Sequence, residues 1–298
     1  MLMNDDQIIT PFKYKKSMQI PDRLGNIPDF EYIMFLISKG AIREREIEIL
    51  EMLKKFRFLT TSQIRRLLGL EEYDRKLKKK LDVLQKNRIV FRFSWLIDDK
   101  PSVMKGFCLD VLGYKILNDY LGEEFEWKME DNLKPMEVIF SHFMFNEIVI
   151  RAKKSPNYVD SFLSDKHIGT GIIIMEGKSG KKPYVVLVLR KSDKWENKFK
   201  ERLGDIVSFL SNGWQSFYES KPIFIILGED KEHITAIAQI IVDMSGSIDT
   251  SARLGIKYTT DDFIMRYPLT EAFANIDVID GELVVNRVIA KIFGEEEV

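Results

Sequence analysis

Three residues in the second half of the chain follow the order of groups that hold Mg²⁺ in many nucleases. Asp165 precedes the triplet Glu176, Gly177 and Lys178. Two carboxylates can ligate a divalent ion that offsets charge on a phosphate, and a lysine can lie near the attacking water. The surrounding EGKSGKK is also typical of a polar turn between two strands, because Gly177 and Gly180 are turn residues. We favour the turn and predict no enzyme activity, with a Mg²⁺-dependent nuclease using Asp165, Glu176 and Lys178 as the alternative.

A second group of residues could bind phosphate without chemistry. Five positive charges occupy the six positions from Arg75 to Lys80, in a chain whose formal net charge is -1. Residues 41–95 carry 15 Lys and Arg against 8 Asp and Glu, whereas residues 229–298 carry 6 against 14. The first of these segments is therefore suited to meet an anion. Runs of charge also occur on solvated helix faces. The elements predicted around the run therefore distinguish a solvated face from an anion-binding surface.

Three amphipathic helices are predicted in this basic segment. Apolar residues recur at helical spacing within residues 42–56. A second, short helix begins at Thr60, which forms a capping-box pattern with Gln63, and it ends at Gly69. A third helix spans residues 73–88, with basic residues on its outer face. Its core face consists of Leu77, Leu81 and Leu84.

A β-hairpin is predicted to follow the third helix. Residues 89–97 and 103–110 are strand-like, and residues 98–102 form a turn between them. Three helices and a hairpin make a winged helix-turn-helix, whose third helix enters the major groove of DNA while the wing contacts the backbone or the minor groove. The predicted DNA-binding residues are Thr61, Ser62, Gln63, Arg75, Lys76, Lys78, Lys79, Lys86, Arg92, Lys100 and Lys105. Glu72 and Asp82 would weaken phosphate attraction, so a protein-interaction adaptor that docks an acidic partner remains an alternative.

The second half of the chain alternates strands and helices. The predicted strands are residues 171–176, 183–190, 222–228 and 253–260. The predicted helices are residues 111–121, 138–154, 194–217 and 231–244. Such alternation indicates an α/β domain with a central mixed sheet. The predicted organisation is an irregular N-terminal arm (1–40), a winged helix (41–121), a linker (122–136) and an α/β domain (137–298).

The order of these elements resembles the replication-relaxation family of plasmids and other mobile elements. The matching stretches are FLTTSQIRRLLG, RKLKKKLDVLQKNRIVFR, VLGYKIL, SHFMFNEIVI with His142 and Asn146, VLVLRKSDKWENKFKERLGDIVSF and KYTTDDF. The resemblance implies a winged helix joined to a restriction-endonuclease-like domain, acting in replication, DNA relaxation or transcriptional regulation. Leu187 and Leu189 stand where the family's acids are expected, and leucine cannot ligate Mg²⁺. The resemblance therefore implies a catalytically inactive second domain that serves assembly.

Composition limits the remaining choices. At 298 residues, of which 45% are hydrophobic, the chain can form two cores. No stretch is long and apolar enough for a membrane span, and the first residues lack the order of a signal peptide, so we expect a cytoplasmic protein. One cysteine and three histidines leave little for Cys- or His-based metal sites, and no cofactor is expected. The expected partners are double-stranded DNA, a second copy of the chain, and a replication or relaxation protein, but no membrane.

Overall fold

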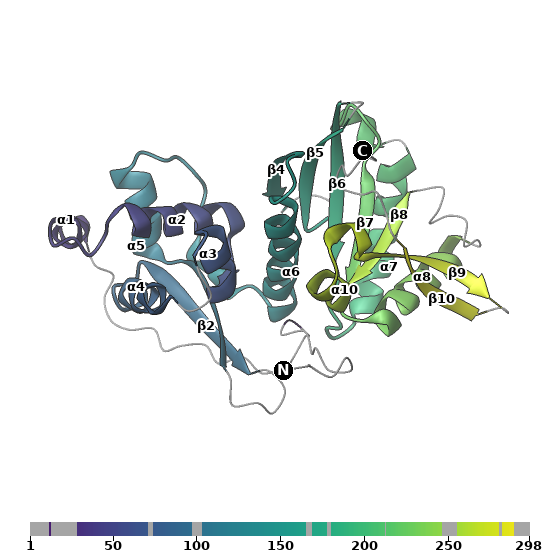
Figure 1. Ribbon diagram of the computed structural model, residues 1–298, viewed down its shortest axis with the longest axis horizontal. Helices are drawn as coiled ribbons and strands as arrows, with labels where there is room; N and C mark the ends of the chain where they lie inside the picture. Colours follow the sequence, from purple (N-terminus) through teal and green to yellow (C-terminus); the bar gives the residue numbers. More distant parts are fainter. Residues whose placement is uncertain are drawn as a thin grey trace. The chain divides into compact units, whose positions relative to one another are not determined.

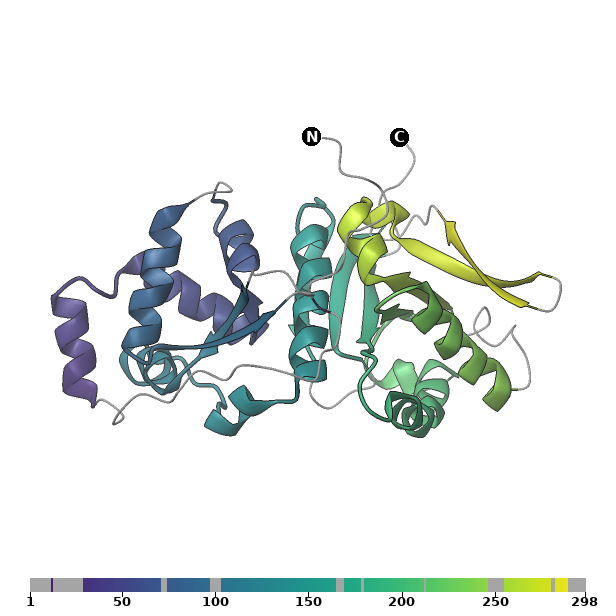
Figure 2. The ribbon, with the colours of Figure 1, turned by 90° about the horizontal axis from the view of Figure 1, so that it is seen from below.

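The computed structural model describes a mixed α+β protein (Figures 1 and 2). The described residues are 12, 29–70, 74–96, 103–164, 169–177, 180–211, 213–245, 255–279 and 282–288. The mixed class predicted from the sequence is confirmed, together with a central mixed sheet. Lys100, Asp165 and Lys178 lie outside the described residues.

Contacts within the chain divide it into two units. The N-terminal unit comprises Lys15–Asn146, and the C-terminal unit comprises Met1–Tyr14 and Glu147–Val298. The division falls inside helix α6 (Met136–Ala152), which lies further along the chain than the linker predicted at residues 122–136.

The N-terminal unit has one more helix at its start than the sequence predicted. Its helices are α1 (Phe30–Ser38), α2 (Glu44–Phe56), α3 (Thr61–Leu67), α4 (Arg75–Lys86), α5 (Val111–Lys115), a π-helix (Ile116–Tyr120), a 3-10 helix (Met129–Leu133) and the first part of α6. The irregular arm predicted for residues 1–40 is wrong at its end, where α1 forms. Asp29 caps α1 by accepting a hydrogen bond from the Tyr32 N–H, and Ile33 and Leu36 are buried. Helical spacing of these two apolar residues was a signal that the interpretation missed.

The three predicted helices of the basic segment are confirmed as α2, α3 and α4. The Thr60 hydroxyl accepts a hydrogen bond from the Gln63 N–H at 3.1 Å, and the Gln63 side chain accepts one from the Thr60 N–H at 3.0 Å. This is the reciprocal capping box that the sequence predicted. Gly69 has a φ of +64°, which suits the residue that ends a helix. Asp74 caps α4, whose three leucines are buried.

A three-stranded antiparallel sheet completes the N-terminal unit. Its strands β1 (Leu59–Thr60), β2 (Val90–Leu96) and β3 (Val103–Leu109) lie in the order β1-β3-β2. β2 and β3 confirm the predicted hairpin strands, whereas β1 has only two residues and was not predicted. The rings of Phe93 and Trp95 in β2 pack against Phe143 of α6, and Trp95 also packs against Phe140. These aromatic contacts pack β2 against α6.

The C-terminal unit contains a seven-stranded mixed sheet. Its strand order is β10-β9-β8-β7-β6-β5-β4. The strands are β4 (Tyr158–Leu163), β5 (Gly171–Gly177), β6 (Gly180–Val188), β7 (Ile223–Gly228), β8 (Ile256–Thr260), β9 (Phe273–Ile279) and β10 (Glu282–Val288). β6, β7 and β8 are parallel to one another, and the other pairs are antiparallel. The outer strands β4, β9 and β10 were not predicted.

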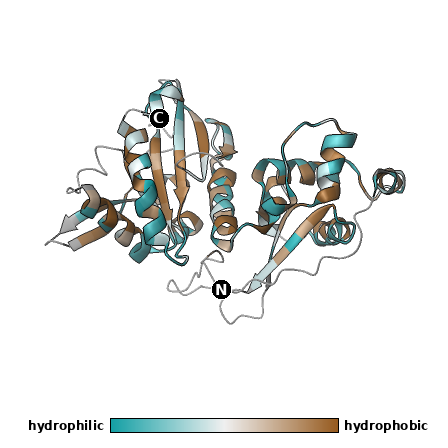
Figure 3. Cartoon of the chain, turned by 180° about the vertical axis from the view of Figure 1, so that it is seen from behind, coloured by the Kyte–Doolittle hydropathy of each residue, from teal (hydrophilic) through white to brown (hydrophobic). Residues whose placement is uncertain are grey.

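Two helices cover one face of this sheet. They are α7 (Trp195–Ser211) and α8 (Lys231–Ser245), whose buried residues form one core with β5 to β8. The central strands are largely hydrophobic, with hydrophilic residues on parts of the strands, while the helices carry hydrophilic as well as hydrophobic residues (Figure 3). A short helix, α10 (Asp261–Arg266), follows β8 directly. Within the described residues, no helix has the length and hydrophobicity needed to cross a membrane.

Candidate nucleic-acid interface

The outer face of α4 carries the strongest concentration of exposed positive charge in the basic segment. Its exposed cations are Arg75, Lys76, Lys78, Lys79 and Lys86. Among the residues that the structure describes, none of these five side chains has an ion-pair partner. The Asp74 side chain accepts hydrogen bonds from the backbone N–H groups of Lys76 and Leu77. It therefore caps the helix without pairing with the cationic side chains of the first turn. The predicted basic face therefore exists as an exposed surface, available to an anion.

Lys80 differs from the other cations of α4. Its Nζ forms an ion pair with Glu46 of α2, whose side chain is buried. A buried carboxylate needs a positive partner, because desolvation of an unpaired charge is costly. Lys80 therefore joins two helices of the N-terminal unit, and the count of five charges between Arg75 and Lys80 overstates the charge available to a ligand by one.

Asp82 and Arg92 form a second ion pair beside this face. Nη1 of Arg92, in β2, lies 3.0 Å from Oδ1 of Asp82, in α4. Asp82 was predicted to repel phosphate and Arg92 was predicted to bind it, but no sequence pattern indicated that they would meet. The pair lies where the helix and the hairpin strand come together.

The predicted contacts on α3 need one correction. Thr61 and Ser62 are half-buried in the first turn of α3, so their placement allows a contact with a ligand. Gln63, in contrast, is fully buried, and its Nε2 donates a hydrogen bond of 2.7 Å to the carbonyl of Phe143. The assignment of Gln63 to DNA binding is therefore wrong. Its side chain links the cap of α3 to α6.

The hairpin supplies one described candidate besides Arg92. Lys105, in β3, is half-buried and pairs with Ser94 in the register of the two strands. The predicted contact at the tip, Lys100, lies outside the described residues. The two residues that match the resemblance in α6 are packed inside the N-terminal unit. His142 lies edge-on to Phe58 at 5.2 Å, and Asn146 donates hydrogen bonds to the carbonyls of Phe56 and Phe58.

Glu176 is the residue of the alternative nuclease site that lies within the described residues. Glu176 lies near the end of β5 with an exposed side chain, opposite Lys181 of β6. Leu187 lies in the core under α7 and α8, and Leu189 packs against the same core. An acid at either position would therefore face apolar side chains. Among the described residues, no three acidic, histidine or cysteine side chains are placed to share a metal ion.

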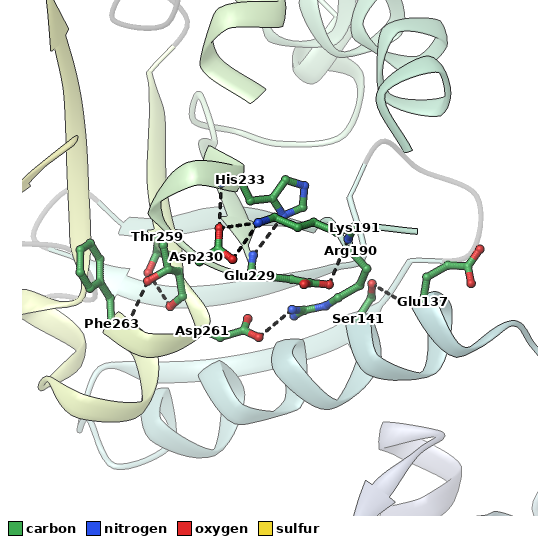
Figure 4. Close-up of polar contacts among 11 residues, drawn as sticks. Glu137, Ser141, Arg190, Lys191, Glu229, Asp230, His233, Thr259, Asp261 and Phe263 are labelled. Atoms are coloured by element: carbon green, nitrogen blue, oxygen red, sulfur yellow. Dashed lines mark hydrogen bonds and ion pairs between the residues drawn. The ribbon is translucent and has the colours of Figure 1, made fainter. Parts of the chain in front are cut away.

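A separate group of charged residues follows the carboxyl ends of β6, β7 and β8 (Figure 4). Arg190 and Asp261 form a buried ion pair, and Lys191 binds both carboxylate oxygens of Asp230 at 2.8 Å. The backbone N–H of Lys191 donates to Glu229. Nε and Nη2 of Arg190 have no hydrogen-bond partner among the described residues. Every acid in the group is bound to a cation or a backbone N–H, as in a structural network.

His233 belongs to the same network. Its Nδ1 accepts a hydrogen bond from the Glu229 N–H, and its ring lies edge-on to Trp195 at 4.4 Å. Burial, together with the charges of Arg190 and Lys191, lowers the pKa of His233 to about 3, against the opposing effect of Asp230. The residue is therefore neutral at pH 7. Its ring is buried because α8 places it against the strand ends.

Comparisons of the chain with protein-family models, with curated proteins and with solved structures gave no match.

Proposed function

We propose that the protein is a sequence-specific double-stranded DNA-binding protein whose N-terminal unit is a winged helix. In this proposal α4 enters the major groove, the start of α3 faces the backbone, and the β2–β3 hairpin forms the wing. The C-terminal unit is a restriction-endonuclease-like domain without catalytic acids, which serves assembly. A role on a plasmid, phage or conjugative element follows from the resemblance alone.

One observation carries this proposal. Five exposed cations of α4 have no acidic partner among the described residues, although the same unit pairs Lys80 and Arg92 with acids. A solvated helix face is usually balanced by acids three or four residues away. On α4 only Asp82 could do so, and it binds Arg92. Unbalanced positive charge on one helix face is the electrostatic pattern of phosphate binding.

The arrangement around α4 supports the same proposal. α3 and α4 follow each other closely, and the antiparallel hairpin of β2 and β3 follows α4. The leucines of α4 are buried, so its basic side must face away from the core. A protein-interaction adaptor would present the same charge to an acidic partner. Unlike a DNA-binding protein, it would not bind duplex DNA at low salt.

The test is salt-dependent binding of the full chain to duplex DNA, measured by fluorescence anisotropy. Affinity should fall steeply with salt, because phosphate contacts release counterions, with a log-log slope of roughly 0.9 per contact. Lys79→Gln/Lys86→Gln should reduce that slope by about 2 if each lysine contacts one phosphate. The matched control is Lys181→Gln/Lys182→Gln, which removes the same charge from exposed lysines of β6 in the C-terminal unit.

The control should leave the slope within the error of the native chain. Absence of binding at low salt would contradict the proposal and favour an adaptor. Equal effects of the two double variants would mean that net charge, and not the face of α4, governs binding.

A further inference from the structure

Arg92 stands at the junction of the two elements that the proposed function brings to DNA. Its backbone belongs to β2, and its Nη1 is held by Asp82 of α4. The two side chains remain 26% and 38% exposed. The structure describes no other partner for Arg92. Nε and Nη2, which form one edge of the planar guanidinium group, are therefore available for a ligand.

Asp82 is an unexpected residue at this place. It follows Lys79 by three positions and precedes Lys86 by four, so the helical period puts it on the side of α4 that carries both lysines. A carboxylate there repels phosphate and would weaken non-specific binding. Its bond to Arg92 gives it a different effect, because it restricts a long side chain that would otherwise lose conformational entropy when it bound a ligand.

We propose that Asp82 fixes Arg92 for bidentate recognition of a guanine, which makes Arg92 a specificity-determining residue. This inference rests on the DNA-binding function proposed above. Arginine bound to guanine O6 and N7 is the commonest specific contact in the major groove, and it uses two adjacent N–H groups of the guanidinium fork. Arg92 lies beside α4, the helix proposed to enter the major groove, and not at the tip of the wing, and it has such an edge free while its remaining end is anchored. Asp82 is then a positioning residue that acts through Arg92.

The two opposing interpretations make different predictions. If Arg92 only contacts phosphate, its loss weakens binding to every sequence alike. If Asp82 is only a neutralising surface acid, its removal strengthens binding to every sequence alike. In the proposed arrangement, loss of Asp82 strengthens non-specific binding and weakens discrimination. This combination of opposite signs means that the acid contributes to sequence recognition, and the double variant with Arg92 shows whether it does so through Arg92.

The experiment begins with selection of a preferred duplex from a random library by the full-length protein. Affinities for that duplex and for a scrambled duplex are then measured at one salt concentration. Asp82→Asn should raise the affinity for the scrambled duplex a few-fold and lower the ratio of the two affinities about tenfold. Arg92→Lys keeps the charge but not the fork, and it should lower the ratio equally. The double variant should lower it no further than either single variant.

A modified base tests the guanine directly. 7-Deazaguanine lacks the N7 acceptor, and it replaces each guanine of the selected duplex in turn. One position should weaken binding of the native chain about tenfold and leave Arg92→Lys unaffected. The control variant is Glu48→Gln, which removes a similar acid bound to Arg45 at 3.0 Å on α2. It should leave the affinity ratio unchanged.

The outcomes separate the two proposals. If the native chain binds no duplex, the DNA-binding function fails, and this inference fails with it. If the native chain binds DNA but Asp82→Asn raises both affinities equally, or if no guanine responds to the loss of N7, only the role of Asp82 and Arg92 is overturned. Thermal unfolding of each variant verifies its fold, and the modified duplexes test the native chain even where a variant unfolds.

Discussion

Arg190 and Asp261, which lie 71 residues apart in the chain, form an ion pair of 2.7 Å in which both side chains are fully buried. Arg190 follows β6, and Asp261 begins α10 directly after β8. The pair therefore spans the end of β7, which lies between those two strands. Arg151 holds the other end of α10 through the carbonyls of Met265 and Tyr267. Arg190 thus ties the start of the short helix to the end of β6, and Arg151 ties its other end to α6.

Asp261→Asn should strongly destabilise the protein. The substitution keeps the shape of the side chain but leaves the Arg190 charge buried without its partner, which costs about 3–5 kcal/mol. The control is Asp262→Asn, since Asp262 pairs with Arg266 where both side chains are partly exposed, and such a pair contributes under about 1 kcal/mol. Denaturant unfolding measures both variants. Similar losses for the two would show that Arg190 finds another partner or a water when Asp261 is neutral.

His233 should make stability depend on pH. Its pKa is about 3 in the folded protein and about 6.5 in the unfolded chain, so the unfolded chain binds the extra proton between these values. The folding free energy that neutral His233 contributes is complete above pH 6.5 and declines as the pH falls towards 3, by on the order of 4 kcal/mol. His233→Asn keeps an acceptor for the Glu229 N–H but cannot titrate. The difference in unfolding free energy between the native chain and this variant should therefore shrink on acidification from pH 7 to pH 4, and a constant difference would contradict the expectation.

The sequence predicted those parts of the N-terminal unit that depend on residues close together in the chain. The capping box of Thr60 and Gln63 and the leucine spacing of α4 lie within one or two helical turns, so the sequence alone shows them. The role of Gln63 could not be predicted, because its second hydrogen-bond partner, Phe143, lies 80 residues away. Asp82 and Arg92 likewise meet only when the sheet packs beside α4. β1 is too short, at two residues, to give a strand pattern.

Gln63→Ala should destabilise the fold and leave DNA binding unchanged. The variant removes the hydrogen bond to the Phe143 carbonyl and half of the capping box, which leaves the buried Thr60 N–H without its acceptor and costs about 1–3 kcal/mol. Ser62→Ala, at the neighbouring half-buried position, should cost under about 0.5 kcal/mol. Unfolding measurements and salt titrations of binding test the two effects separately. A reduced salt slope in Gln63→Ala under conditions where it is folded would restore this residue to the interface.

The C-terminal unit should not cleave DNA. Leu187 lies in the core under α7 and α8, so an aspartate introduced there would be buried without a partner and would destabilise the unit before it could ligate a metal. We expect purified protein to leave supercoiled plasmid intact in Mg²⁺ or Mn²⁺, and Leu187→Asp to lower the melting temperature without producing cleavage. The contrary result would be cleavage by the native chain that Glu176→Gln and Asp165→Asn each abolish while DNA binding persists. The control is Glu124→Gln, which neutralises an exposed acid of the N-terminal unit and should cleave as the native chain does. If this variant also lost cleavage, the activity would not depend on Glu176 and Asp165, and a contaminating nuclease would explain it.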